Sequence, residues 1–358
     1  MAGTLALVAR AIETVLVLGA RGALGSRAAR LLAAGLPAAR VLGASRRGEA
    51  ALGPGARAAD VRRREGLARA LEGVDLVVNA VGPYAYDPAP LVEACVAARA
   101  AYVDLAEDAA FAAALRAAAV RAGAEAAGVA FVPGCSTTPG LVEVLAQRFA
   151  ALPALASVAA YLSLGSGNAP SAGLLAGLLR PLGRRLPDGG RAFGRVVRRD
   201  AAGRRRAFGR FPSGLAGELA RVGAREVPLR FHAGFDRAAL VHALRLAAPA
   251  LAALPSPVLA PLARALLPVA HLACGVGTPL GVLRVEALDA RGAELAAVEV
   301  VAERAGLDVP AAPCVWAARA LRAGARTGVL RLADLVAPDE AVAALRALGC
   351  TVAERAAA

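Results

Sequence analysis

A short apolar segment followed at once by closely spaced glycines constrains the fold of this chain more than any other feature. Residues 14–19 read TVLVLG, a β-branched run that is typical of a strand buried on both faces of a parallel sheet. The chain continues as GARGALG over residues 19–25, and an alanine- and leucine-rich segment from Ala23 to about Ala34 predicts a helix. A strand, a glycine turn and a helix in this order favour the first unit of an α/β protein.

The same alternation of strand and helix continues to residue 135. Further strands are predicted at residues 40–44, 57–60, 75–80, 101–104 and 129–133, and further helices at residues 64–71, 88–99 and 108–122. Six strands separated by helices or short crossovers predict a doubly wound parallel sheet. Right-handed crossovers place the carboxyl ends of its strands along one edge, where ligands bind.

After residue 135 the pattern changes to a mixture of strands and helices. Strands are predicted at residues 157–164, 191–199, 204–210 and 227–232, with a hairpin of residues 281–289 and 294–303. Helices are predicted at residues 138–150, 236–254 and 257–272. Residues 136–312 are therefore expected to form a second, smaller mixed α+β domain for substrate binding or homodimer formation. The tail, residues 313–358, has helices at 314–321 and 339–348 and a strand at 350–353, and the sequence assigns it to neither domain.

The amino-acid composition excludes several catalytic and phosphate-binding mechanisms. The chain of 358 residues has a net charge of +14 and no lysine, so its 42 basic residues are all arginines. This excludes a Schiff-base lysine, a Tyr-Lys pair and a phosphate-binding Walker lysine. A strong positive charge can indicate nucleic-acid or anionic-membrane binding. Arginine and alanine enrichment runs through the whole chain, however, so we expect no nucleic-acid partner; salt-sensitive DNA or RNA affinity would indicate one.

The cysteines and the first apolar segment indicate in which cellular compartment the protein is expected. The five cysteines are widely spaced, form no CxxC motif and predict neither a disulfide framework nor a zinc site: Cys95, Cys135, Cys274, Cys314 and Cys350. With no HxH or HExxH motif, no metal site is predicted. Arg10 and Glu13 interrupt the first apolar run, which is unlike a signal peptide. A cytoplasmic setting is expected.

Two long uncharged segments raise the question of a membrane. Residues 246–263 and 265–283 contain no charged side chain, but prolines and glycines interrupt both. A spanning helix would need partners for each lost backbone donor, so neither segment predicts a transmembrane span. Buried helices or an apolar lid over a hydrophobic substrate fit better, and contact with a membrane surface stays open as the alternative.

The glycine loop predicts a dinucleotide site within residues 1–135. Gly19 would allow the tight turn, Gly22 would let the backbone approach a pyrophosphate, and Gly25 would let helix and strand pack closely. The pyrophosphate would lie at the positive end of the helix. The alternative is a purely structural glycine-rich turn in an alanine-rich protein. The cofactor-binding residues expected in this loop are Gly19, Ala20, Arg21, Gly22, Ala23, Leu24 and Gly25.

The end of the second predicted strand bears on the choice of cofactor. An NAD site would place an acidic residue there, but this chain has Ser45, Arg46 and Arg47. Arginines suit a 2′-phosphate, so we predict NADP, with NAD as the alternative. Arg21 could stack on adenine or add a second positive charge. Asp60, at the end of the third strand, could accept from the adenine amino group or cap the next helix.

The fourth strand runs into the sequence NAVGPYAYDP, which adds further candidates. Asn79, Gly82 and Pro83 at this strand end would form the floor under the nicotinamide ribose. The expected cofactor-binding residues here are Ala80, Val81, Gly82 and Pro83. Tyr84 and Tyr86 would project toward the crevice, where a tyrosine can donate a proton to a forming alkoxide or amine. Packing with a solvated hydroxyl is the alternative.

Four segments resemble the saccharopine dehydrogenase-like oxidoreductases: GARGALG at 19–25, DLVVNAVGPY at 75–84, LVEACVAARAAYVDL at 91–105 and FVPGCSTTPGL at 131–141. A weaker likeness lies in TGVLRLADLVAP and LRALGCTV near the C-terminus. The resemblance implies a Rossmann domain, a smaller mixed-sheet domain and NADP(H) at the switch point of the sheet, with substrate between the domains.

The same resemblance implies particular site residues. Gly82 and Pro83 would line the cofactor, Asp104 would lie at the end of the fifth strand, and the loop from Ser136 to Gly140 would lie under the nicotinamide. Two departures matter. Asp87 stands where the family tends to have a small residue, and the missing lysine removes the acid-base group of the lysine-pathway members. The reaction of those members is therefore not carried over.

Three further candidates have competing interpretations. Cys135 could be a nucleophile, but no histidine lies near it in sequence, and small buried filler is the alternative. His232 ends a predicted strand and could act as a general acid or be a packed histidine. The arginine-rich stretch 180–210 predicts a hairpin whose arginines alternate outward, as a solvated face or a site for an anionic substrate.

The sequence therefore predicts a cytoplasmic NADP-dependent oxidoreductase acting on a small molecule. Hydride would move to or from a C=N, C=O or activated C=C bond. The apolar residues 246–283 favour a hydrophobic or acyl substrate over a free amino acid. The alternative is a non-catalytic module that senses NADP(H), favoured by the scarcity of obvious acid-base residues.

Overall fold

The computed structural model describes residues 11–48, 55–304, 306–324 and 326–356, and the chain divides into two compact units. The first is built from the segment ending at Ala106 together with Ala110–Gly140 and Pro310–Val336. The second is built from Glu107–Ala109, Leu141–Val309 and the segment beginning at Ala337. The tail that the sequence left unassigned is thus divided between the two units.

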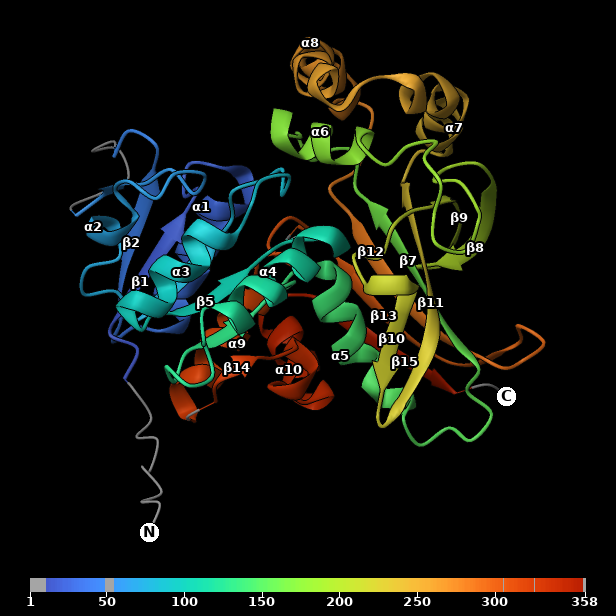
Figure 1. Ribbon diagram of the computed structural model, residues 1–358. Helices are drawn as coiled ribbons and strands as arrows, with labels where there is room; N and C mark the ends of the chain where they lie inside the picture. Colours follow the sequence, from blue (N-terminus) through green and yellow to red (C-terminus); the bar gives the residue numbers. More distant parts are fainter. Residues whose placement is uncertain (1–10, 49–54, 305, 325, 357–358) are drawn as a thin grey trace. The chain divides into compact units, whose positions relative to one another are not determined.

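A parallel sheet of seven strands forms the centre of the first unit, in the order β14-β6-β5-β4-β1-β2-β3 (Figure 1). All six neighbouring pairs are parallel, which confirms the predicted doubly wound sheet. Its strands are β1 (Thr14–Leu18), β2 (Arg40–Ser45), β3 (Arg57–Ala58), β4 (Leu76–Asn79), β5 (Ala101–Asp104), β6 (Ala130–Val132) and β14 (Gly328–Val329). The strand order reverses beside β1, which is where α/β sheets bind ligands.

The helices of the first unit are α1 (Ala23–Gly35), α2 (Leu67–Ala70), α3 (Ala89–Ala98), α4 (Ala109–Arg121) and α9 (Ala312–Ala323), with a short helical turn, η5 (Leu332–Asp334). The continuous apolar strands account for the core, because a parallel sheet is covered on both faces. Leu16 on β1, Val77 on β4 and Phe131 on β6 are fully buried. From the tail, α9 packs against α1, and β14 adds the seventh strand beside β6.

The second unit contains a mixed sheet in the order β15-β13-β12-β7-β11-β9-β8, with β10 paired to β11. Only the pair of β7 and β11 is parallel among the described strands of this sheet. The strands are β7 (Ser157–Leu164), β8 (Val196–Ala201), β9 (Arg204–Arg210), β10 (Leu219–Val222), β11 (Arg225–Phe235), β12 (Gly281–Leu288), β13 (Glu294–Ala302) and β15 (Thr351–Ala356). A mixed α+β second unit is therefore confirmed.

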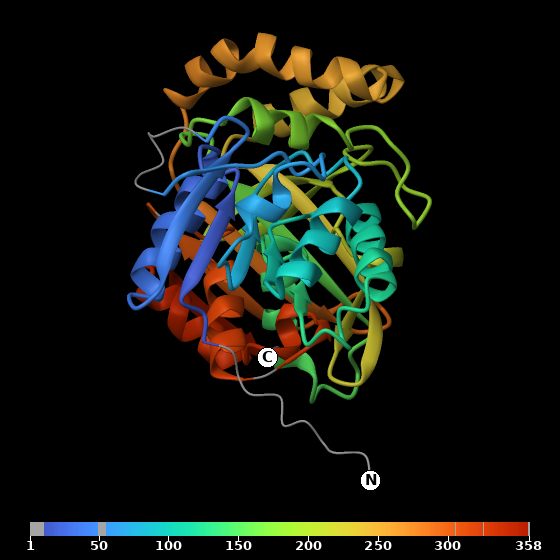
Figure 2. The same ribbon diagram turned by 60° about the vertical axis from the view of Figure 1, so that its left-hand side comes forward.

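Its helices are α5 (Val142–Ala146), α6 (Ala172–Leu179), α7 (Ala238–Ala253), α8 (Ser256–Cys274) and α10 (Pro338–Ala347), with short helical turns η3 (Gln147–Phe149) and η4 (Ala216–Glu218). Figures 1 and 2 both show α6, α7 and α8 together at one end of this unit, and α6 packs against α8. Within the described part of the chain, none of the helices combines the length and the apolar character needed to cross a bilayer.

Two predicted boundaries were wrong. The helix expected at residues 138–150 begins only at Val142, after a wide turn η2 (Thr137–Leu141) in which Thr138 is extended, with φ −125° and ψ 138°. Pro139 explains this, because a residue before proline is pushed out of the helical region. The strand expected from Arg191 begins at Val196, since Phe193 has a φ of +56° that a regular strand does not allow.

The outward alternation of the arginines was also wrong at Arg206. This side chain is buried, donating to the Ala201 carbonyl at 3.1 Å and to the Ser163 hydroxyl at 3.1 Å. The hairpin of β8 and β9 curls back over the sheet, where Arg199 lies over the Tyr161 ring at 5.5 Å and donates to its hydroxyl at 3.2 Å. The curl encloses one face of β9 that a flat hairpin would leave in solvent.

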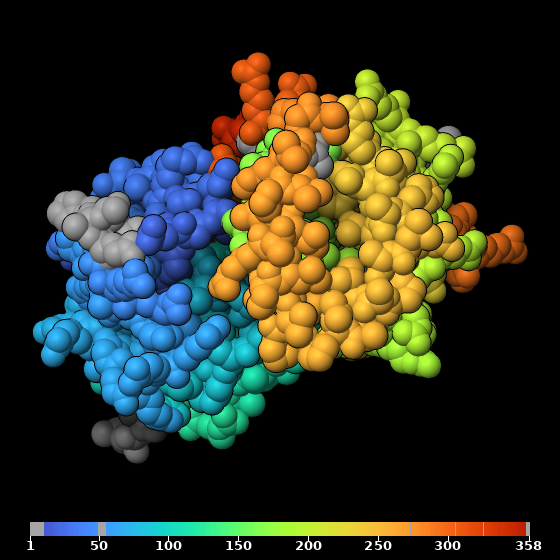
Figure 3. Space-filling view, turned by 90° about the horizontal axis from the view of Figure 1, so that it is seen from above, coloured from blue at the N-terminus to red at the C-terminus, as the bar shows by residue number. Residues whose placement is uncertain are grey.

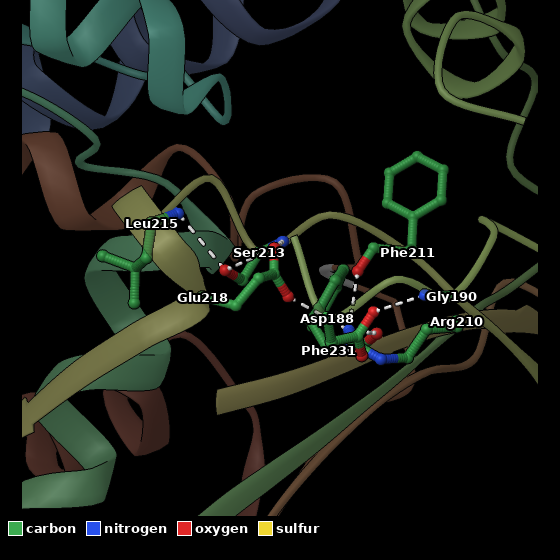
Figure 4. Close-up of polar contacts among 8 residues, drawn as sticks. All are labelled: Asp188, Gly190, Arg210, Phe211, Ser213, Leu215, Glu218 and Phe231. Carbon is green, nitrogen blue, oxygen red and sulfur yellow. Dashed lines mark hydrogen bonds and ion pairs between the residues drawn. The ribbon is translucent and has the colours of Figure 1, made fainter. Parts of the chain in front are cut away.

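Arg210, at the end of β9, holds two loops of the second unit to the sheet (Figure 4). Its guanidinium donates to the Glu218 carboxylate at 3.1 Å, to the Asp188 carboxylate at 2.9 Å and to the Phe231 carbonyl at 3.1 Å. The other oxygen of Glu218 accepts from the backbone and hydroxyl of Ser213 at 3.0 and 3.2 Å. The buried Glu218 is therefore fully paired, as a buried carboxylate must be.

Candidate functional site

The glycine loop is packed so closely that two of its positions exclude any side chain. Gly19 has a φ of +76°, and a Cβ there would lie 3.0 Å from the Ala80 carbonyl oxygen on the β4 side. A Cβ at Gly25 would lie 2.2 Å from the Gly19 carbonyl oxygen. The Gly19 N–H donates to the Ala44 carbonyl at 3.1 Å, which ties the loop to the end of β2. Loop, helix and the ends of three strands therefore form one rigid edge.

Gly22, at the start of α1, is different because it faces solvent. A Cβ there would meet only the Gly19 oxygen, at 3.1 Å. The residue is extended (φ −71°, ψ 160°), provides no side-chain cap to α1, and the first turn of the helix has no acidic residue. The first-turn amides and the helix dipole thus present a positive end with no carboxylate of that turn to offset it, and this arrangement suits a diphosphate.

The end of β2 lies beside this helix end. Ser45 accepts from the Arg47 backbone N–H at 3.3 Å, and both Arg46 and Arg47 are exposed. Within the described ranges, neither guanidinium makes a hydrogen bond or an ion pair. Arg21, in the loop, is also exposed. The Asp60 carboxylate accepts from the Arg62 N–H at 3.1 Å, as a local turn cap does.

The end of β4 is organised by Asn79, a fully buried residue that the sequence had placed in the expected floor under the nicotinamide ribose. Its side-chain amide donates to the hydroxyls of Tyr86 at 2.8 Å and Tyr102 at 2.9 Å, and its side-chain oxygen accepts from the Val81 N–H at 3.1 Å. The Tyr84 hydroxyl donates to the Asn79 carbonyl at 2.9 Å. Burial raises the pKa of Tyr86 well above its usual range.

Asp104, at the end of β5, is fully buried next to Asn79 in the strand register. The Tyr102 hydroxyl donates to one of its oxygens at 3.0 Å, and the N–H groups of Ala106 and Gly134 donate to the other at 2.9 and 2.8 Å. Burial raises the pKa of Asp104 to about 6, although these three hydrogen bonds oppose the rise. The carboxyl group therefore joins the ends of β5 and β6.

The loop after β6 is equally enclosed. Gly134 has a φ of +76°, and a Cβ there would lie 2.8 Å from the Pro139 ring. Cys135 is fully buried with its thiol directed at the Val132 carbonyl, and burial raises its pKa well above the usual value. The thiol is protonated at neutral pH and behaves as filler. Ser136 is also buried, at 1% exposure.

His232 lies on β11 of the second unit. Its ring stacks on Tyr161 with centroids 4.7 Å apart, and its Nδ1 is buried with no hydrogen-bond partner among the described residues. Burial, together with the positive charge of Arg210, lowers the pKa of His232 to about 3. At neutral pH the ring is uncharged, which is unfavourable for a general acid.

A buried charge cluster on the second sheet had only a weak signal in the sequence, the alternation VLRVEAL. Arg284 donates to Glu286 and Glu294 at 2.7 Å each, and Glu286 is also paired with Arg199 at 3.5 Å. Burial raises the pKa of Glu286, while Arg284 opposes the rise. No group of three or more His, Cys, Asp or Glu side chains is placed to hold a metal in the described part of the chain.

The structure thus brings most of the predicted cofactor residues to one edge of the first sheet. Because β1 lies between β2 and β4, the glycine loop adjoins both Ser45 and the segment 80–83. Tyr84 belongs to the same edge, whereas His232 belongs to the second unit. Tyr102 was missed, and its only signal was its position two residues before the acidic end of β5.

Comparisons with known proteins agree with a dinucleotide-binding role for this edge of the first sheet. Residues 15–132 match the family model described as the saccharopine dehydrogenase NADP binding domain. No curated protein matches the chain. Among solved structures, the apo saccharopine dehydrogenase (L-Glu forming) from Saccharomyces cerevisiae is 14% identical, with a TM-score of 0.61 over 97% of this chain and 100% of that one. This likeness concerns the fold.

Two further structures are less similar. A mutant of meso-DAPDH from Clostridium tetani E88 is 10% identical, with a TM-score of 0.49 over 93% of this chain and 96% of that one. An amine dehydrogenase from Mycobacterium smegmatis is 13% identical, with a TM-score of 0.47 over 91% and 96%.

The matched segment contains the glycine loop, the arginines after β2, Asn79 and Asp104, which together make up the edge described above. The chain therefore belongs to the class of NAD(P)-dependent oxidoreductases. Within that class it carries a saccharopine dehydrogenase-like NAD(P)-binding domain, with NADP as the favoured cofactor.

Proposed function

We propose that this protein transfers hydride between NADP(H) and a C=N, C=O or activated C=C bond of a small hydrophobic or acyl molecule. The observation that carries the proposal is the solvent-facing Gly22 at an uncapped helix end, beside two exposed arginines without ion pairs in the described ranges. The helix end suits the diphosphate, and Arg46 and Arg47 suit a 2′-phosphate.

The remaining residues of the edge would complete the cofactor site. The nicotinamide would supply or accept the hydride, and the chain would orient it and exclude water. Residues 19–25 would bind the diphosphate, Asp60 would lie toward the adenine, and residues 80–83 would support the ribose. Asp104 and Ser136 would hold the floor beneath, because both are buried and Asp104 joins the ends of β5 and β6.

Tyr84 is the group we propose as proton donor. It is half-buried at the end of β4, and its hydroxyl lies 2.9 Å from the Asn79 carbonyl. His232 was the other candidate for the proton donor. With a pKa of about 3, its imidazole is uncharged at neutral pH and has no imidazolium proton to donate. Tyr84→Phe should lower kcat by about a hundredfold while NADPH binding is kept. Tyr86→Phe is the matched control, since that hydroxyl is held by Asn79.

The hydrophobic or acyl character of the substrate is proposed from the second unit. The segments 246–263 and 265–283 contain no charged side chain, so they offer no ionic partner for the two charges of a free amino acid. A panel of imines, ketones, aldehydes and enoyl thioesters, each in a short-chain and a long-chain form, would test this. Faster NADPH oxidation with the long-chain members is expected; a preference for free amino acids would contradict it.

The cofactor assignment is tested by parallel titrations with NADPH and NADH. Arg46→Asp should weaken NADPH about tenfold and leave NADH nearly unchanged, because the change places a negative charge against the 2′-phosphate. Arg116→Asp, at an exposed arginine on α4, is the matched control and should change neither affinity. Equal weakening of both coenzymes by Arg46→Asp would contradict the choice of NADP.

A non-catalytic NADP(H)-binding module is the second candidate. It is favoured by the enclosed hydroxyls of Tyr84 and Tyr86, the neutral His232 and the protonated Cys135 thiol, which leave few groups ready for proton transfer. Tight NADPH binding without reduction of any compound in the panel would support this candidate over the enzyme.

A further inference from the structure

The exposed large apolar side chains of this protein are concentrated on α7, α8 and the turn that follows. In the described part of the chain eight such side chains are exposed, and six of them lie in this segment. The six are Leu246, Val258, Leu266, Val269, Leu272 and Val276. Leu272 and Leu246 are 79% and 78% exposed, so neither is covered by a neighbour. Such a concentration marks an interaction surface.

On α8 these side chains follow the repeat of the helix. One face packs inward, where Leu259 and Ala263 are 3% and 0% exposed and α6 lies against the helix. Val258, Ala265, Val269 and Leu272 recur every three to seven residues on another face, which is exposed, and Val276 is exposed in the turn that follows the helix. A surface helix normally carries polar side chains there. The helix therefore has a second apolar face with no partner in the described chain.

The charged side chains of the chain segment that forms this face are all of one sign. Between Asp236 and Glu286 the chain has no acidic residue. Arg237, Arg245 and Arg264 are exposed in this stretch. An apolar face flanked by arginines without any carboxylate is complementary to an anionic lipid surface. Pairing with a second copy of the same face would instead bring like charges together.

The geometry suits a helix that lies along a membrane. Neither α7 nor α8 could span the bilayer, and both contain proline within the helix. Figure 3 shows the orange atoms of α7 and α8 together forming a broad part of one face of the second unit. A helix of this kind rests in the plane of the interface with its apolar side chains at the acyl boundary.

We propose that α7, α8 and the turn through Val276 bind the surface of a membrane rich in anionic phospholipid. The apolar stripe would insert among the upper acyl chains, and Arg245 and Arg264 would meet the phosphate groups. The cofactor site belongs to the other unit, so this surface and NADPH binding depend on different residues.

Sedimentation of the full-length protein with vesicles tests the proposal. We expect binding to vesicles of phosphatidylcholine with phosphatidylserine, weaker binding to phosphatidylcholine alone, and loss of affinity with added salt. The double variant Val269→Glu with Leu272→Glu should lower the partition coefficient at least about tenfold. Val120→Glu is the matched control, because Val120 is 75% exposed on α4 and should not affect partitioning.

Three outcomes would overturn the proposal. The first is no binding of the unmodified protein to vesicles that contain phosphatidylserine. The second is an equal loss of binding in Val120→Glu, which would show nonspecific adsorption. The third is a smaller particle for the double variant in light scattering without lipid, which would show that a second copy covers the face. An unchanged circular dichroism spectrum and an unchanged urea midpoint of the double variant confirm that its second unit is folded.

Discussion

Raising the pH from about 4 to about 7 should weaken the first unit through one buried carboxyl group, that of Asp104. Burial moves its pKa from the usual 3.8 to about 6 in the folded protein. Since the folded state holds this proton more tightly, its contribution to stability is complete below the unfolded value of 3.8 and is lost as the pH rises through about 6. At about 1.4 kcal/mol per pKa unit, the loss is roughly 3 kcal/mol.

Asp104→Asn isolates this effect because an amide does not titrate. Urea unfolding of both proteins can be followed by the fluorescence of Trp316, the single tryptophan, which lies on α9 of the first unit at 6% exposure. The free energy of unfolding of the unmodified protein minus that of the variant should fall by about 3 kcal/mol over this pH range. A difference that stays constant, or that grows with pH, would refute the reasoning.

Gly25→Ala should destabilise the first unit by about 1–3 kcal/mol, because the new Cβ would lie 2.2 Å from the Gly19 oxygen. Gly22→Ala, whose Cβ would lie 3.1 Å from the same oxygen, should destabilise it by less than half as much in the same urea titration. Arg210→Met should destabilise the second unit by about 3–5 kcal/mol, since it leaves the buried Glu218 carboxylate without its ion pair. Urea unfolding followed by circular dichroism measures this change, and a loss of stability under about 1 kcal/mol would contradict the pairing. His232→Gln should leave the pH profile of kcat unchanged from about pH 6 to 8, because the ring is neutral throughout; disappearance of a pKa from that profile would show that the histidine does titrate there.

Local sequence patterns were sufficient to predict the strands and helices whose formation depends on residues close together in the chain. The strand before the glycine loop, predicted from TVLVLG, is β1 (Thr14–Leu18), and the predicted hairpin is β12 with β13. A buried parallel strand needs a continuous apolar run, and a hairpin needs alternation and a turn, so both leave a signal within a few residues.

Features that depend on distant contacts left no such signal. Arg206 is buried only because the hairpin curls toward β7, and β14 is a strand only because its two residues, Gly328 and Val329, pair with β6. Tyr102 looks like an ordinary strand residue until the pairing of β4 with β5 brings its hydroxyl within 2.9 Å of the Asn79 amide. Nothing in the propensity of these residues encodes the partner that fixes their role.

The division of the tail between the two units has a consequence during synthesis on the ribosome. The seventh strand and α9 of the first sheet domain come from Pro310–Val336, and the edge strand β15 of the second comes from Thr351–Ala356. A nascent chain that has emerged only to residue 309 lacks a piece of both, so neither unit can reach its final packing before its part of residues 310–356 has emerged. Late completion of both units, rather than full maturation of the first before the second is synthesised, follows from this connectivity.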